Sequence, residues 1–194
     1  MQAHLAKLTD HRVFAEQEAN DRTLVARARA GDTAAFERLV ERYQRVLFTV
    51  ALRMLGDYDA ASDAAQTAFI KAYEKLDAFD PTRRFFSWIY RILVNECLNA
   101  RRDDRPFEPI PPDLTAAGTP ADFFEAAERR QRVQAAILAL PIDYREVVVL
   151  RYFTELSYDE IGEVLHVPAK TVKSRLHTAK ERLAALLPDL EARA

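Results

Sequence analysis

Apolar residues recur every three to four positions along most of the chain, which is the period that places them on one face of an α-helix. Between residues 21 and 102 this period predicts four helices. Gly31 and Gly56 are expected to end the first two, because glycine adopts the left-handed conformation readily. Side chains suited to cap the later helices are Asp32 or Thr33, Asp57 or Asp59, and Thr82. No segment shows the two-residue alternation of a half-buried strand, so we expect an all-α protein.

Residues 103–120 interrupt this pattern. They include five prolines and Gly118, a composition that is incompatible with a continuous helix and typical of a semi-extended linker. Helical periodicity resumes after this stretch. The pattern therefore predicts two small helical domains, over 21–102 and 121–194, joined by this Pro-rich linker and preceded by a flexible N-terminal extension over 1–20.

Two consecutive helices are predicted near the C-terminus with a short break between them. Ser157 and Glu160 have the Ser-x-x-Glu spacing of a capping box, which marks the start of the first helix. The break over 166–168 ends in a proline, and a second amphipathic helix follows. Its apolar stripe is Val172, Leu176, Ala179, Leu183 and Leu186. This arrangement is typical of a helix-turn-helix, in which the second helix enters the major groove of DNA.

The polar face of this last helix is basic and rich in hydroxyl groups, which suits contacts to phosphates and base edges. Its candidate DNA-binding residues are Lys170, Thr171, Lys173, Ser174, Arg175, His177 and Thr178. A basic helix face is also a common form of ordinary solvated surface. The capped helix and the proline break directly before it favour the DNA-binding interpretation.

A second candidate surface lies on the third predicted helix. Asp63, Gln66 and Ile70 follow an i, i+3, i+7 spacing and share a flank away from the apolar stripe. A polar flank with an exposed isoleucine is typical of a surface that binds a partner. A solvated face with one stray apolar residue would give the same pattern.

The C-terminal segments resemble the extracytoplasmic-function (ECF) sigma factors, which direct bacterial RNA polymerase to promoters. The stretches 140–152 (LPIDYREVVVLRY) and 156–165 (LSYDEIGEVL), followed by VP at 167–168 and TVKSRL at 171–176, resemble the sigma region that reads the minus-thirty-five element. The stretch 63–70 (DAAQTAFI) is similar to the sigma region that grips the clamp helices of the polymerase. The resemblance therefore implies that Asp63, Gln66 and Ile70 dock core RNA polymerase.

The segments 79–81 (FDP) and 85–92 (FFSWIYRI) resemble the sigma region that opens DNA at the minus-ten element. The minus-ten contacts that this resemblance implies are Phe79, Asp80, Arg83, Arg84, Trp88, Asn95, Arg101 and Arg102. For Trp88 a second interpretation stays open, because its helical spacing with Ile92 is also typical of a core aromatic residue.

Three positions of the helix-turn-helix differ from the pattern common in the family. Gly162 stands where alanine is common, His166 where glycine is usual, and Thr178 where arginine is common. His166 must then adopt the turn conformation without being glycine, and Thr178 removes a cation from the DNA-facing side. On the third helix, Ser62 and Thr67 make the polymerase-docking surface less acidic than usual.

Composition argues against several other classes of function. The formal net charge is −2, so binding to nucleic acid must depend on local charge. Cys97 is the only cysteine, which rules out an internal disulfide and a zinc site built from this chain's thiols, and we expect it to be a buried structural thiol. The sequence has no Cys/His metal spacing, Gly-rich phosphate loop or nucleophile motif. We therefore expect no enzymatic activity, no metal and no cofactor.

No apolar stretch approaches the ~20 residues of a membrane span, and the N-terminus lacks the apolar core of a signal peptide. We expect a cytoplasmic protein without membrane insertion. The resemblance implies a sigma factor that binds core RNA polymerase and promoter DNA, acts in a stress or environmental response, and is controlled by an anti-sigma factor.

Two alternatives to a sigma factor remain. A stand-alone helix-turn-helix regulator would bind DNA without polymerase. It would need neither the surface of Asp63, Gln66 and Ile70 nor the aromatic and basic residues over 79–102. An interaction protein that mimics a sigma factor would not need the basic recognition helix. The presence of all three features in one chain favours the sigma factor.

Overall fold

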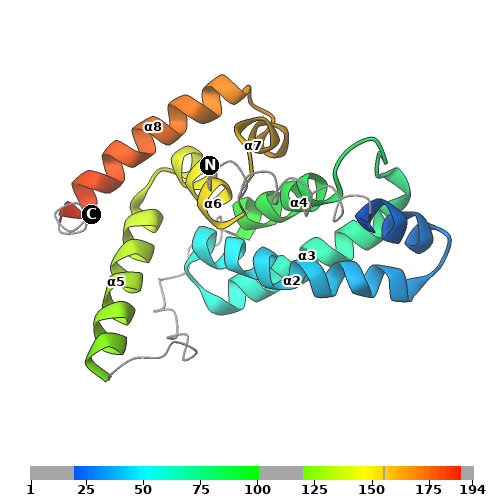
Figure 1. Ribbon diagram of the computed structural model, residues 1–194, viewed down its shortest axis with the longest axis horizontal. Coiled ribbons are helices and arrows are strands. Elements are labelled where there is room, and N and C mark those ends of the chain that lie inside the picture. The colour runs from blue at the N-terminus through cyan, green and yellow to red at the C-terminus, as the bar shows by residue number, and fades with distance from the viewer. Residues whose placement is uncertain (1–19, 101–119, 155, 189–194) are drawn as a thin grey trace, which may run out of the picture.

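The computed structural model describes residues 20–100, 120–154 and 156–188, and every regular element within these ranges is helical (Figure 1). Of the expected N-terminal extension and linker, only Asn20 and Pro120 fall within the described residues. Arg101 and Arg102 lie outside them, and the side chains of 120–126 are not described. The all-α prediction is confirmed for the described part of the chain.

The first helical block comprises a helical segment over 20–29 and the elements that follow it. These are α2 (Thr33–Leu55), α3 (Tyr58–Glu74), the short 3-10 helix η1 (Leu76–Ala78) and α4 (Phe85–Ala100). Figure 1 shows α2, α3 and α4 side by side, and both α2 and α4 contact α3 and each other. Apolar residues from all of them are buried between the helices, as the sequence period predicted.

Local chemistry sets the helix boundaries in this block. The Asp32 carboxylate accepts a hydrogen bond from the Ala35 amide at 3.2 Å, and the Asp57 carboxylate accepts one from the Ala60 amide at 2.6 Å. Each therefore pairs an amide that the first turn of a helix leaves without a partner. Gly56 ends α2 in the left-handed conformation at φ 76°. The structure confirms Asp32 and Asp57 as helix caps and Gly56 as the end of α2.

The start of α4 differs from the prediction that Thr82 caps it. The Thr82 amide and hydroxyl both donate to the Asp80 carboxylate, at 2.9 and 2.7 Å. Thr82 therefore belongs to a turn held by Asp80, and the helix begins later, at Phe85. The prediction was wrong because the Thr82 hydroxyl group can either cap a helix or bond to a nearby side chain in a turn, and here it bonds to Asp80.

The second block contains α5 (Pro120–Ala139), α6 (Ile142–Phe153), α7 (Tyr158–Leu165) and α8 (Ala169–Leu186). Helices α7 and α8 form the expected helix-turn-helix. The capping box is present in both directions: the Ser157 hydroxyl accepts from the Glu160 amide at 3.3 Å, and the Glu160 carboxylate accepts from the Ser157 amide at 2.7 Å. This reciprocal pair fixes where α7 begins.

The turn between α7 and α8 is made by His166 in the left-handed conformation, at φ 56° and ψ 39°. The Val167 amide donates to the Gly162 carbonyl at 3.0 Å, which closes the end of α7. A Cβ added at Gly162 would lie 2.6 Å from the Val167 carbonyl oxygen. The turn that His166 completes therefore passes too close to position 162 for a larger residue, and this accounts for glycine there.

The two blocks pack against each other. Helix α2 contacts α5 and α6, α4 contacts α7, and the buried apolar residues of both blocks form one cluster. Two buried polar side chains of the second block reach the carboxyl end of α2. Gln134 donates to the Leu52 carbonyl at 3.3 Å, and Arg145 donates to the Met54 carbonyl at 2.7 Å. The Leu52 carbonyl also accepts from the Gly56 amide at 2.9 Å, whereas the Met54 carbonyl lies in the last turn of α2, where carbonyls lack partners within the helix.

Candidate nucleic-acid and polymerase surfaces

Helix α8 buries its apolar stripe and turns its basic side outward. Val172, Leu176 and Ala179 are buried, whereas Leu186, which the sequence pattern also placed in the stripe, is 48% exposed near the end of the helix. The candidate DNA-binding residues divide into exposed Lys170, Lys173, Ser174 and His177 and half-buried Thr171, Arg175 and Thr178. All seven lie on α8, and the exposed ones present cations and hydroxyl groups away from the core.

Two of the cationic side chains on α8 are oriented by α6. The Arg175 guanidinium lies 3.4 Å from the Asp143 carboxylate. The Arg182 guanidinium lies over the ring of Tyr144, 4.8 Å from its centroid. Such contacts restrict long side chains that would otherwise sample many rotamers, so α6 positions part of the basic face of α8.

The candidate docking surface on α3 is also exposed. Asp63, Gln66 and Ile70 all lie on the solvent side, and Ile70 is 59% exposed. Tyr73, on the same helix, is 49% exposed and meets the ring of Phe36 edge-on at 5.0 Å. The result is an apolar spot of Ile70 and Tyr73 beside two polar residues, which is the composition of a partner surface.

The candidate minus-ten residues do not share one environment. Asp80, Arg83, Arg84 and Asn95 are exposed, whereas Phe79 is buried with 3% of its surface exposed. Hydrogen bonds from the Thr82 hydroxyl and amide lower the pKa of the Asp80 carboxyl, so this side chain is charged at neutral pH. Polar and charged groups therefore line the surface, and the phenylalanine lies beneath it.

Phe79 belongs to an aromatic cluster at the base of this loop. Its ring lies 5.9 Å from that of Phe85 and 5.1 Å from that of Trp88, and Tyr43 meets Phe85 from α2 at 5.8 Å. Trp88 is half-buried, so it both packs in the cluster and keeps part of its ring at the surface. The cluster anchors the loop 80–84 to the core. The buried position of Phe79 gives it a supporting role rather than direct access to a base.

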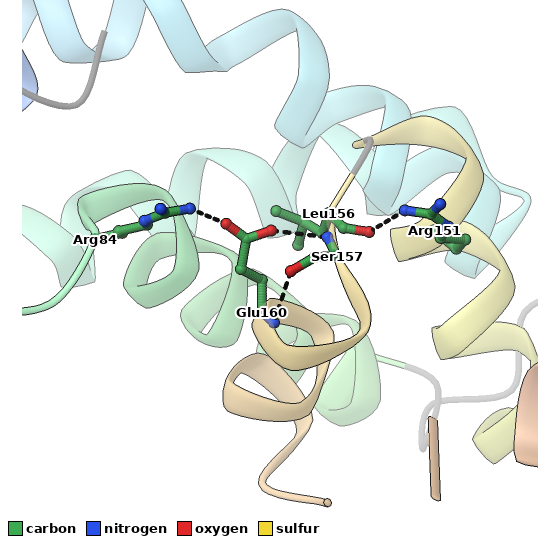
Figure 2. A network of polar contacts seen from close by, with 5 residues as sticks. All are labelled: Arg84, Arg151, Leu156, Ser157 and Glu160. Carbon is green, nitrogen blue, oxygen red and sulfur yellow. Dashed lines mark hydrogen bonds and ion pairs between the residues drawn. The ribbon is translucent and has the colours of Figure 1, made fainter. Parts of the chain in front are cut away.

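A polar network joins this loop to the helix-turn-helix (Figure 2). The Arg84 guanidinium donates to the Glu160 carboxylate, which also accepts from the Ser157 amide. Nearby, the Arg151 guanidinium donates to the Leu156 carbonyl at 2.6 Å. Sequence reasoning identified Glu160 only as a capping residue, because a local motif contains no signal for a partner 76 positions away.

Gln134 and Arg145 are further polar residues that sequence reasoning missed, and both are buried. The Arg91 guanidinium, in the segment that resembles the minus-ten region, donates to the Glu163 carbonyl across the two blocks. Within the described residues, no group of three or more His, Cys, Asp or Glu side chains is placed to hold a metal. None of the helices in this described part of the chain combines the length and the apolar character that crossing a membrane requires.

Comparisons with known proteins match both blocks. The family profile described as Sigma-70 region 2 matches residues 39–106, and that described as Sigma-70, region 4 matches residues 130–183. The ECF RNA polymerase sigma factor SigW of Bacillus subtilis is 38% identical over 181 residues, which cover 86% of this chain and 96% of that protein. The chain belongs to the extracytoplasmic-function sigma factor family. The ECF RNA polymerase sigma-E factor of Escherichia coli K12 is 34% identical over 180 residues. The match covers 86% of this sigma factor and 94% of the Escherichia coli protein.

Solved structures agree with this assignment. The structure of CnrH in complex with the cytosolic domain of CnrY matches with a TM-score of 0.70 and 31% identity, over 90% of this chain and 99% of that chain. The sigma factor RpoE of Bartonella quintana, solved in complex with the anti-sigma factor NepR, matches with a TM-score of 0.66 over 79% of this chain and 96% of that chain. The two sequences are 23% identical, so this match shows a similar fold. The first block of this sigma factor is therefore region 2, and the second contains region 4.

Proposed function

We propose that this ECF sigma factor docks core RNA polymerase through α3, engages the minus-ten element with the loop before α4, and reads the minus-thirty-five element with α8. One observation carries the proposal. Region 2 and region 4 occur on one chain in the order typical of the family, and the recognition helix of region 4 buries its apolar stripe and exposes its cations. The domains proposed for these tasks are 21–102 and 121–194, joined by 103–120.

At the minus-thirty-five element, the proposed contacts are Lys170, Thr171, Lys173, Ser174, Arg175, His177 and Thr178. The half-buried Arg175 has a different role from the exposed lysines. Its contact with Asp143 limits its rotamers, which suits bidentate hydrogen bonding to a guanine edge. Lys170 and Lys173 are exposed and can follow the phosphate backbone, which requires charge more than fixed geometry.

At the minus-ten element, the proposed surface contacts are Asp80, Arg83, Arg84 and Asn95, with Arg101 and Arg102 at the end of the same segment. Phe79 supports this loop from below, and Trp88 offers the exposed part of its ring. Opening a duplex leaves single-stranded phosphates and unstacked bases, which cations and aromatic rings can stabilise. The charged loop over an aromatic cluster has both kinds of group.

Polymerase docking on α3 is tested by co-purification with core enzyme. The double variant Asp63→Ala/Gln66→Ala should lower retention of the sigma factor on immobilised core polymerase by roughly tenfold or more, since an interface contact worth ~1.4 kcal/mol changes affinity tenfold. Both side chains are exposed, so circular dichroism and the melting temperature should stay at wild-type values.

The matched control is Glu41→Ala/Gln44→Ala. These residues have the same chemistry and the same i, i+3 spacing on exposed positions of α2. The control should bind core polymerase like the wild type. Equal retention of the α3 variant and the wild type would remove α3 from the docking surface.

The proposal also includes control by an anti-sigma factor, because the related CnrH was solved in complex with the cytosolic domain of CnrY. A protein that acts on polymerase and chromosomal DNA works in the cytoplasm, and its function is binding rather than chemistry. We accordingly propose no enzymatic activity and no cofactor for this sigma factor.

A further inference from the structure

A carboxylate is buried near the start of the first helical block. Asp21 lies in the helical segment over 20–29 and is 2% exposed. One of its carboxylate oxygens accepts from the Arg42 guanidinium and the other from the Tyr43 hydroxyl, and both partners belong to α2. Removing a charge from water costs free energy that such partners offset only in part, so a buried ion pair is by itself a weak source of stability.

The segment does not need Asp21 to stay attached to α2. Leu24, Val25 and Ala28 are buried and belong to the same apolar cluster as the core of α2. Burial of their apolar surface provides the attachment. Asp21 adds a fixed direction, because hydrogen bonds depend on angle whereas apolar contacts do not. The Tyr43 hydroxyl is therefore held in one place.

Tyr43 transmits this restraint to the start of α4. Burial, together with the charge of the Asp21 carboxylate, raises the pKa of the Tyr43 hydroxyl far above its usual value, so the hydroxyl keeps its proton and keeps donating. The ring of Tyr43 lies 5.8 Å from the ring of Phe85, which is the first residue of α4. Figure 1 shows the segment over 20–29, in dark blue, at the end of the block where α4 begins.

Phe85 in turn packs against aromatic residues on both sides of the loop 80–84. Its ring lies 5.9 Å from that of Phe79, which precedes the loop, and 5.8 Å from that of Trp88 on α4. Phe79 and Phe85 are each 3% exposed, whereas the loop residues between them are exposed. A closely packed interior transmits displacements, so a loop with both ends in one aromatic cluster moves when the cluster moves. A continuous set of contacts thus leads from Asp21 to the loop.

We propose that Asp21 is a positioning residue for DNA opening: through Tyr43 and Phe85 it holds the loop 80–84 in the conformation that engages the minus-ten element, without touching DNA itself. This inference rests on the function proposed above for the loop. Stabilising an unstacked base requires groups held within about 0.5 Å of their working positions, and a shift of the cluster alters that geometry. Asp21 also precedes residues 39–106, which the region 2 profile matches.

Two variants separate positioning from stability. Asp21→Ala leaves the buried Tyr43 hydroxyl without this acceptor, so both the melting temperature and DNA opening should fall. The Arg42 guanidinium is 27% exposed and can bind water instead. In Asp21→Ala/Tyr43→Phe both partners of the hydrogen bond are absent, so much of the stability should return. The restraint is still missing, so the opening defect should remain, whereas a residue that served stability alone would let opening recover with the melting temperature.

Asp32→Ala is the matched control. Asp32 is also an aspartate that pairs with an arginine, and it caps α2 at the Ala35 amide. Its loss should lower the melting temperature. DNA opening should stay at the wild-type level, because Asp32 lies outside the contacts that lead from Asp21 to Phe85. All measurements of opening are made well below the lowest melting temperature in the set.

Trp88 reports directly on the aromatic cluster, because it is the only tryptophan of the chain and packs within that cluster. The free full-length proteins are labelled with a fluorinated tryptophan and compared by fluorine NMR. We expect the wild-type resonance in Asp32→Ala, and a shifted or broadened resonance in Asp21→Ala and in the double variant. An unchanged resonance in the double variant would overturn the proposal.

DNA opening is measured with core polymerase as permanganate reactivity of minus-ten thymines, on a promoter fragment obtained by run-off transcription. The double variant should open the fragment roughly three- to tenfold more slowly than the wild type, the range expected of a residue that acts on a site through its neighbours. On the same fragment with mismatched bases across the minus-ten element, the difference should fall to about twofold or less, because mismatched bases cost little to unstack. Wild-type opening of the duplex fragment, or equal slowing on both fragments, would contradict the proposal.

Arg83→Ala distinguishes a failure of this inference from a failure of the function proposed for the loop. Arg83 is exposed on the loop, and its loss should slow opening if the loop engages the minus-ten element. If Arg83→Ala slows opening and the double variant does not, the loop acts as proposed but Asp21 does not position it. If neither slows opening, the function proposed for the loop is wrong and the role of Asp21 falls with it.

Discussion

Single residues in this sigma factor show where side-chain chemistry overrides the hydrophobic pattern. Nothing in the sequence marks Gln134 and Arg145 as buried residues, because glutamine and arginine are seldom buried. In the structure they are buried and bond to carbonyls at the end of α2. The periodicity predicts which face of a helix is apolar, but it contains no information on a polar residue that pairs backbone groups of another element.

Cys97 gives the first prediction at this scale, and it concerns pH. Burial, with a smaller effect of the neighbouring Glu96, raises the pKa of the Cys97 thiol to about 12. In the unfolded chain the thiol ionises near pH ~8.5. Above that pH the unfolded state loses a proton that the folded state keeps, so the free energy of unfolding falls as pH rises.

We expect the wild type to lose about 1 kcal/mol of stability between roughly pH 7.5 and pH 9.5 relative to the Cys97→Ala variant. Chemical denaturation of both proteins at each pH measures the difference. The alanine variant is the control, because it keeps every other titrating group. Parallel pH profiles for the two proteins would show that the thiol ionises equally in the folded and unfolded states.

Arg175 gives the second prediction at the residue scale. Arg175→Ala should weaken binding to the minus-thirty-five element by roughly 1–3 kcal/mol, because an arginine on the recognition helix can make paired hydrogen bonds to a guanine edge that alanine cannot make. Footprinting of the sigma factor with core polymerase on a promoter fragment measures the change. Arg38→Ala removes the same charge from an exposed position of α2 and should leave the footprint intact. An unchanged footprint with Arg175→Ala would exclude this residue from the site.

At the scale of elements, capping motifs were the most reliable guide. Asp32, Asp57 and the Ser157–Glu160 box all begin their helices as the sequence predicted, because each motif is satisfied within four residues. The start of α4 was wrong, since the Thr82 hydroxyl donates to Asp80 instead of capping the helix. A threonine has two local structures open to it, and the sequence does not show which one prevails.

The turn of the helix-turn-helix carries a prediction at this scale. Gly162→Ala would place a Cβ 2.6 Å from the Val167 carbonyl oxygen, and the clash should outweigh the ~1 kcal/mol by which alanine favours a helix. His166 adopts the left-handed conformation in the same turn, and His166→Gly removes the steric cost of that conformation. Alanine at position 162 together with glycine at position 166 is the combination common in the family, so we expect the two substitutions to be coupled.

A double-mutant cycle by thermal and chemical denaturation measures this coupling. Gly162→Ala alone should lower stability, and it should be less damaging by about 1 kcal/mol in the His166→Gly background. The single His166→Gly variant is the control for the effect of glycine by itself. Additive effects, within ~0.3 kcal/mol, would mean that the turn does not link the two positions.

At the scale of the whole molecule, the sequence predicted two helical blocks but not how they pack against each other. Helices α2 and α4 of region 2 contact α5, α6 and α7 of the second block, and apolar residues of both form one cluster. The family resemblance identified α3 and α8 as functional surfaces, and both are exposed in this arrangement. The contact between Arg84 and Glu160 had no local signal, because it depends on how two independently patterned segments dock.

Promoter-specific initiation by this sigma factor is the central claim, and run-off transcription tests it most directly. Purified core RNA polymerase is assayed on fragments of the source genome with and without the protein. We predict discrete transcripts that require both components and whose start sites share an upstream sequence motif. An absence of transcripts, together with sequence-specific DNA binding by the protein alone, would contradict the claim and indicate a stand-alone helix-turn-helix regulator.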